Sequence, residues 1–155
     1  SVRSKARDVE KIHSQLENQL GRAPSEEEMA TKLGVSVDDF RNTLLEIANS
    51  SVLALDDLWT VADGDGGQVS LLDTIRDPHA VDPEDAIDTV ELKDRLAEAI
   101  ESLPDRERLV IALYYYETLT LREIGEVLGV TESRVSQLHT KAVLGMRSHL
   151  SAAAA

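Results

Sequence analysis

Apolar residues recur at steps of three and four along both ends of this chain, a spacing that predicts helices. The first such stripe runs through residues 1–20 and consists of Val9, Ile12, Leu16 and Leu20. The segment from Gly21 to Pro24 interrupts the pattern, so we expect the first helix to end near residue 20.

Two shorter helices, joined by a glycine turn, are predicted next. Ser25 and Glu28 have the spacing of a capping box, which satisfies the first backbone N–H groups of a helix. Gly34 can end that helix, and Ser36 is a suitable N-cap for the following one. Their apolar positions are Met29, Ala30, Leu33, Val37, Phe40, Leu44, Leu45 and Ile47. Residues 1–49 are therefore predicted to form a three-helix domain.

The helical pattern resumes after Pro83. One stripe runs from Ala86 to Leu103, and Pro104 stands in the first turn of the next helix, where proline is tolerated. The expected buried face of that helix is Leu109, Val110, Leu113 and Tyr114. Residues 119–150 then have the spacing of a helix-turn-helix, with Gly129 at the turn and Thr131 as N-cap of the second helix. The expected buried face of its first helix is Leu121, Ile124, Val127 and Leu128. Residues 84–150 are thus a predicted four-helix domain, and residues 151–155 a tail.

The two helical hairpins are related by an internal repeat at an offset of 95 residues. Cap, core and turn positions match, as Ser25 with Thr120, Glu28 with Glu123 and Gly34 with Gly129 illustrate. The outward positions differ, because Asp38 and Asp39 stand where the later copy has Ser133 and Arg134. Two carboxylates would repel a DNA phosphate, so we expect the first hairpin to serve packing only.

Charge divides the chain into three parts. Residues 1–50 hold seven Lys/Arg against nine Asp/Glu, residues 51–94 two against twelve, and residues 95–155 seven against eight. The acidic excess therefore lies in the middle, where residues 50–83 also lose the helical period. We expect an all-α protein of two small helical domains joined by this acidic, largely irregular linker. The linker is too apolar for a plain tether, so it is expected to lie along another surface; the alternative is that it folds back on its own domains.

The second helix of the helix-turn-helix carries the candidate binding chemistry. Its expected outer face, which the turn should leave free, consists of Glu132, Ser133, Arg134, Ser136, Gln137, His139, Thr140 and Lys141. These residue types can hydrogen-bond base edges and phosphates in a major groove. Residues 132–150 hold three cations against one anion, in contrast to the acidic chain as a whole. The pattern therefore favours DNA binding over an ordinary helical bundle.

Other functions lack support in the sequence. There is no cysteine, which is typical of a reducing cytosol and removes thiolate metal sites. No apolar run approaches the roughly 20 residues of a membrane span, and no signal peptide is recognisable. Asp63-Gly64-Asp65 opens like a calcium loop, but Thr74 stands at the twelfth position, where a glutamate is required. The four histidines lack metal-ligand spacing, so we expect no metal. No glycine-rich phosphate loop follows a strand, and the carboxylate pairs stand in solvated, glycine-rich sequence, so we also expect no cofactor and no enzymatic activity.

Two separate motifs resemble a known family. The segment from Gly21 to Glu28, followed by Leu33-Gly34-Val35, resembles region 3 of a bacterial RNA polymerase sigma factor of the sigma-70 family. The segment from Leu103 to Arg108, followed by Leu119 to Lys141, resembles region 4. The segment from Thr131 to Gln137 is most similar to the flagellar and sporulation (WhiG-like) group. We expect the chain to be a fragment, because it begins within a helical pattern and ends in a run of alanines. Region 2, which melts the −10 element in this family, is absent, so the chain alone is not expected to open a promoter.

The resemblance implies a cytoplasmic transcription factor that binds core RNA polymerase and promoter DNA. By position, Glu132, Ser133 and Gln137 would read the −35 element, while Arg134, Ser136 and Lys141 would contact phosphates. Thr120 and Arg122 open the first helix, whose free N–H groups can take a phosphate. Arg3, Ser4 and Arg7 lie where the family approaches DNA upstream of the −10 element. Glu132-Ser133 replaces the Arg-Glu of the housekeeping pattern, which leaves the base preference open.

The resemblance also implies protein partners. The linker would enter the polymerase cleft, and apolar faces of the C-terminal domain would contact the polymerase or an anti-sigma protein. The expected contact residues are Leu71, Leu72, Ile75, Leu96, Ile100, Leu109 and Leu113. The alternative is a stand-alone helix-turn-helix regulator, which would bind DNA without polymerase and has no evident use for the acidic linker.

Overall fold

The computed structural model describes residues 1–50, 60–62, 68–70 and 86–154. Helices dominate this part of the chain, which confirms the all-α class. A short antiparallel pair of strands, β1 (Thr60–Ala62) and β2 (Gln68–Ser70), was not expected; Val61 pairs with Val69 in its register. The predicted contact residues Leu71, Leu72 and Ile75 lie outside the described residues.

The N-terminal helices end and begin where the caps predict. α1 (Val2–Leu20) is capped by the Ser1 side chain and ends at Gly21, whose φ of 71° lies in the left-handed region. α2 (Glu26–Leu33) begins after Ser25 with the complete capping box of Ser25 and Glu28. α3 (Val37–Ala48) begins after Ser36, whose hydroxyl accepts from the Asp39 amide.

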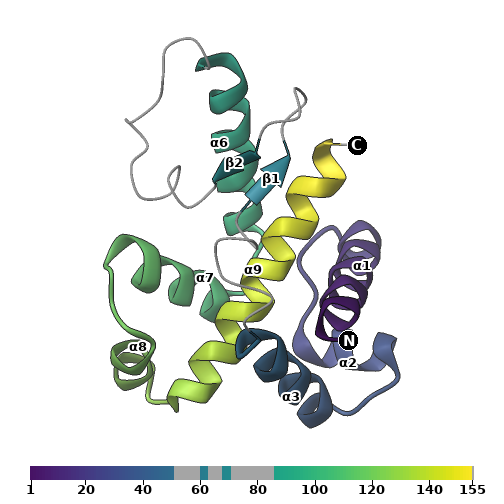
Figure 1. The fold of residues 1–155 in the computed structure, drawn as a ribbon, viewed down its shortest axis with the longest axis vertical. Helices are drawn as coiled ribbons and strands as arrows, with labels where there is room; N and C mark the ends of the chain where they lie inside the picture. Colours follow the sequence, from purple (N-terminus) through teal and green to yellow (C-terminus); the bar gives the residue numbers. More distant parts are fainter. Residues whose placement is uncertain (51–59, 63–67, 71–85, 155) are drawn as a thin grey trace.

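The C-terminal helices are arranged around the last of them, which is also the longest. They are α6 (Ala86–Glu101), α7 (Asp105–Ile111), the π-helical turn η3 (Ala112–Tyr116), α8 (Leu121–Leu128) and α9 (Glu132–Ala154). Figure 1 shows α9 running through the middle of the molecule, with α7 and α8 on one side and α1, α2 and α3 on the other. α9 therefore packs against both predicted domains.

The buried side chains form two clusters that reflect this arrangement. The larger one joins residues from both ends of the chain, including Val9, Phe40, Leu44, Leu103 and Leu144. The smaller one joins α7 to the helix-turn-helix and consists of Val110, Ile124, Val135 and Leu138. The predicted domain boundaries at residues 49 and 84 stay a prediction, and in this arrangement the packing of side chains crosses them.

Two predicted buried faces are wrong in part. Leu109 is 43% exposed and Val127 is 62% exposed, although periodicity predicts that both side chains are buried. On these short helices a position at the margin of the apolar stripe turns toward solvent, because an ideal apolar stripe covers only about a third of the helix circumference. Both side chains are thus available at the surface.

Candidate nucleic-acid interface

The turn between α8 and α9 is built by a few residues with special requirements. The Thr120 hydroxyl accepts from the Glu123 amide, and the Glu123 carboxylate accepts from the Thr120 amide, so α8 has a complete capping box. Gly129 follows with a φ of 71°. A Cβ at Gly125 would stand 2.8 Å from the Val130 carbonyl oxygen, so the chain can fold back this closely only over a glycine. The Thr131 hydroxyl then caps α9 by accepting from the Arg134 amide.

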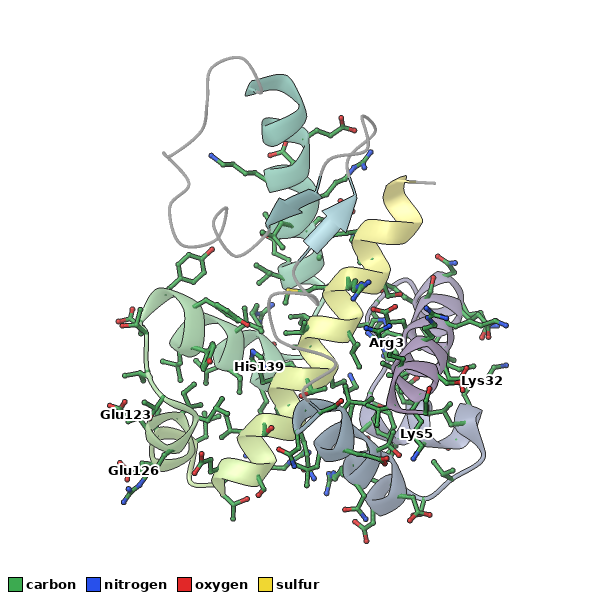
Figure 2. All side chains as sticks on the ribbon, viewed as in Figure 1. Arg3, Lys5, Lys32, Glu123, Glu126 and His139 are labelled. Carbon is green, nitrogen blue, oxygen red and sulfur yellow. The ribbon has the colours of Figure 1, made fainter. Side chains whose placement is uncertain are left out.

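The N-terminal end of α9 is open to solvent. Glu132 and Ser133, the first two predicted base-reading residues, are exposed, and Ser136 is partly exposed. Thr120 and Arg122 at the start of α8 are exposed as well, with Arg122 3.8 Å from Glu126 on the same helix. Figure 2 shows Glu123 and Glu126 at the outer edge of the molecule. The Thr120 amide, however, already donates to Glu123, so a phosphate at this helix start would have to displace that carboxylate.

Further along α9, Arg134 is bound by the N-terminal part of the chain. Both terminal guanidinium nitrogens of Arg134 donate to the Glu26 carboxylate at the start of α2, with Nη1 2.8 Å from Oε2. Arg41 of α3 donates to the same carboxylate, its Nε 3.1 Å from Oε2. Burial alone would raise the pKa of Glu26, but the hydrogen bonds from Arg134 and Arg41 outweigh it and hold this pKa at about 2. The guanidinium that is predicted to contact a DNA phosphate is therefore already paired with a carboxylate.

The next two predicted DNA contacts are also covered. Gln137 is 8% exposed and its amide nitrogen donates to the Arg41 carbonyl oxygen at 3.3 Å. Lys141 is 1% exposed; its ammonium donates to Glu107 of α7 at 2.8 Å and to the Pro24 carbonyl oxygen at 2.7 Å. Burial raises the pKa of Glu107 although Lys141 opposes this. The expectation that the outer face of α9 is free is therefore wrong for this arrangement, because α2, α3 and α7 supply partners for its polar side chains.

Two other residues of that expected outer face point inward. Thr140 is 3% exposed, and His139 is 4% exposed with its Nε2 2.8 Å from the Tyr115 hydroxyl of η3. Figure 2 shows His139 in the centre of the molecule. Burial lowers the pKa of His139 to about 4, so its ring is neutral near pH 7. These two residues belong to the packing between α9 and its neighbours.

The remaining predicted site residues lie on separate elements. Arg3, Ser4 and Arg7 are exposed along α1, and Figure 2 shows Arg3 on the side of the molecule away from α8. Among the predicted protein contacts, Leu109 is exposed, Ile100 and Leu113 are partly buried, and Leu96 is 4% exposed. The described residues hold no group of three or more metal-ligating side chains. They also contain no helix that is long and apolar enough to cross a membrane.

The α8–α9 unit and its solvent-exposed start define a helix-turn-helix protein of the all-helical class. Two family models match the chain, Sigma-70 region 3 over residues 4–87 and Sigma-70 region 4 over residues 99–148. The chain belongs to the sigma-70 family and contains these two regions.

Named relatives agree with this assignment. The RNA polymerase sigma factor FliA of Escherichia coli strain K12 is 43% identical over 151 residues, covering 97% of this chain and 61% of its own length. The RNA polymerase sigma-D factor of Bacillus subtilis strain 168 is 40% identical over 149 residues, covering 96% and 57%. The solved flagellar sigma/anti-sigma complex Sigma-28/FlgM aligns with a TM-score of 0.48 at 35% identity, covering 97% of this chain and 61% of that one. The chain thus spans about three-fifths of the length of the curated relatives that it matches.

Proposed function

We propose that this chain is the part of a sigma factor that directs core RNA polymerase to the −35 element of promoters. The observation that carries the proposal is the sigma-70 region 4 helix-turn-helix, whose reading helix α9 starts with the exposed Glu132 and Ser133. Its relatives are RNA polymerase sigma factors, so the proposed partners are core polymerase and promoter DNA, and the proposed place of action is the cytoplasm. The residues from Thr131 to Gln137 support an assignment to the flagellar and sporulation group.

The arrangement of α9 implies that DNA reading requires a second, open form. Arg134 and Gln137 are held by α2 and α3, and Lys141 reaches Pro24, so a major groove cannot approach these three side chains in the closed form described above. Separation of α9 from α2 and α3 would free Arg134 and Gln137, while Lys141 would keep its partner Glu107. The roles of Arg134, Ser136 and Lys141 toward phosphates, and of Gln137 toward a base, belong to the open form.

The proposed protein partners use surfaces that the closed form leaves accessible in part. Leu109, Tyr116 and Val127 are large apolar side chains that remain at the surface of α7, η3 and α8. Core polymerase would bind this face and select the open form, whereas an anti-sigma protein would bind the same face and keep the closed one. A ligand shifts such an equilibrium only by the difference in its affinity for the two forms. Leu96 becomes available to a partner only if the packing around it changes.

Binding assays with purified core polymerase test the proposal. The chain should bind core polymerase at moderate salt, and deletion of residues 50–83 should weaken that binding. Specific binding to DNA without any binding to polymerase would instead identify a stand-alone regulator.

A paired substitution tests the closed form. Glu26→Gln removes the charge that holds Arg134, and we expect about tenfold tighter binding to a −35 duplex, since a hydrogen bond between charged groups contributes about 1.5–3 kcal/mol. Glu27→Gln, at the exposed neighbouring residue, is the matched control and should change affinity only by the small effect of one surface charge. Fluorescence anisotropy measures both; equal affinities for the two variants would contradict an occluding role of Glu26.

A further inference from the structure

A second contact between the two parts of the molecule lies between α1 and α9. At its centre is His13 of α1, which is 1% exposed. Opposite it stands Gly145 of α9, where a Cβ atom would come within 2.5 Å of the His13 Nε2. The imidazole thus occupies the space that any side chain at residue 145 would need.

The charged groups around His13 come from both helices. Its Nδ1 lies 3.4 Å from a carboxylate oxygen of Glu17, one turn further along α1. His149 of α9 bonds the other oxygen of the same carboxylate through its Nδ1. Lys141 of α9, bound to Glu107, adds a positive charge that disfavours a charged His13. One carboxylate is therefore shared by two histidines on opposite sides of the contact.

Neighbouring groups complete the electrostatic surroundings of this contact. Glu10 of α1 lies 3.3 Å from Arg147 of α9. The ion pair between α1 and α3 is Lys5 with Glu46, more than two helical turns from His13. From α2, the charged side chains near α1 line a shallow groove beside Leu16; they are Glu27, Glu28 and Lys32. The state of His13 is consequently governed by α1 and α9.

We propose that His13, Glu17 and His149 form a proton-responsive latch that holds α1 against α9 while His13 is neutral and opens when His13 is charged. The proposal rests on the closed form described under the proposed function, and it names a signal that would release the DNA-reading helix. Acidification of the surroundings is that signal, and the latch requires no partner protein to respond to it.

The sign of the response follows from His13. Burial, the largest effect, lowers the pKa of His13 below its ordinary value of about 6.5, and the nearby Glu17 carboxylate opposes this only in part. His13 therefore binds a proton more readily in the open form than in the closed form. The latch is fully stable above about pH 6.5 and weakens as pH falls below it. Between the pKa of His13 in the closed form and about pH 6.5, each pH unit changes the ratio of open to closed molecules about tenfold.

The two carboxylates of this contact act in different pH ranges. Burial would raise the pKa of Glu17, but the neighbouring His13 and the hydrogen-bonded His149 lower it, so its protonation also favours opening below about pH 4.5. Burial raises the pKa of Glu10 against the attraction of Arg147, so its protonation opposes opening, and it does so above about pH 4.5. Opening between pH 5 and 6.5 is therefore driven by His13, since Glu10 acts in the opposite direction there.

Energy transfer between two fluorescent labels tests the latch on the whole chain. The natural sequence contains no cysteine, so Gln15→Cys on α1 and Glu126→Cys on α8, both exposed positions, place labels on the two parts. We expect transfer to fall between pH 7.5 and 5 while the helical circular dichroism signal is retained. His13→Gln should abolish this pH dependence, whereas His149→Gln should retain it. Gly145→Ala should lower transfer already at pH 7.5, because its Cβ displaces His13.

Two results would overturn the latch. One is constant transfer from pH 7.5 to 5 in the parent chain; the other is an unchanged transition in His13→Gln. If His13→Gln fails to fold, the imidazole proton resonances of the unsubstituted chain decide, since His13 must titrate below about pH 6.5. Polymerase is absent from these assays, so their failure leaves the sigma-factor function untouched.

Discussion

The hairpins α2–α3 and α8–α9 have the same local structure in the first helix and the turn but differ in the second helix. Both first helices have eight residues, both carry a complete capping box, and both end at a left-handed glycine, Gly34 or Gly129. Their second helices differ, because α3 ends at Ala48 after 12 residues whereas α9 continues for 23 residues. The turn chemistry thus specifies a hairpin, and the length and polar face of the second helix decide what it does.

The polar faces of the two hairpins are complementary in charge. Position 39 is aspartate in the first hairpin, and its equivalent is Arg134 in the second. In turn, the first hairpin has Glu26 where the second has Leu121. One copy therefore supplies the carboxylate and the other the guanidinium of the contact that closes the molecule.

Substitution of equivalent residues in the two hairpins should differ most in its effect on the free energy of unfolding at Lys141 and Glu46. Lys141→Ala would leave Glu107 buried and uncompensated, and we expect a loss of about 3–5 kcal/mol in the free energy of unfolding. Glu46 pairs with Lys5 at the surface, both side chains being 47% exposed, so Glu46→Ala should cost at most about 1 kcal/mol. Urea denaturation measures both losses; similar values would contradict the buried role of Lys141.

A smaller effect is expected where the two turns differ, at Gly125 and Ala30. Gly125→Ala gains helix propensity but forces a Cβ against the Val130 carbonyl, so we expect a net loss of about 1–2 kcal/mol. Ala30→Gly removes a buried methyl group and should also cost about 1–2 kcal/mol. Thermal unfolding measures the loss in each variant. A stabilised Gly125→Ala variant would show that the turn has room for a side chain.

The smallest difference is expected at the caps. Ser25→Ala and Thr120→Ala each remove the hydroxyl that accepts from the third residue of the helix, so each should cost about 1 kcal/mol. The same urea titration applies. A loss at one cap that is several times the loss at the other would mean that one capping hydroxyl has a further role that the repeat does not share.

The sequence predicts the local structure well, because caps and turns depend on residues three to five positions apart. Ser25 with Glu28, Thr120 with Glu123, and the glycines at 34 and 129 set the helix ends within one or two residues. The contacts of the candidate site could not be predicted in this way. Glu26 and Arg134 are 108 residues apart, and neither periodicity nor spacing connects them.

Lysine and glutamine are usually exposed, which led to the wrong expectation for α9. The sequence predicts that Lys141 and Gln137 face solvent, because long polar side chains are rarely buried without partners. The partners exist, but they come from α3, from α7 and from Pro24 ahead of α2, which the helical pattern treats as separate elements. His13 gave no signal at all, since a lone histidine on an apolar stripe is consistent with ordinary core packing. The role of His13 becomes apparent only from the structure, where its imidazole fills the space beside Gly145.

The position of α9 in the larger core has a consequence for the lifetime of the protein in the cell. Val9 and Leu16 of α1 share one buried cluster with Val143 and Met146 of α9. Any event that draws α9 away uncovers part of that apolar surface, and chains with uncovered apolar surface are substrates for chaperones and proteases. We therefore expect an opened molecule to persist only while another protein covers what α9 has left, so its turnover would follow its occupancy by a partner.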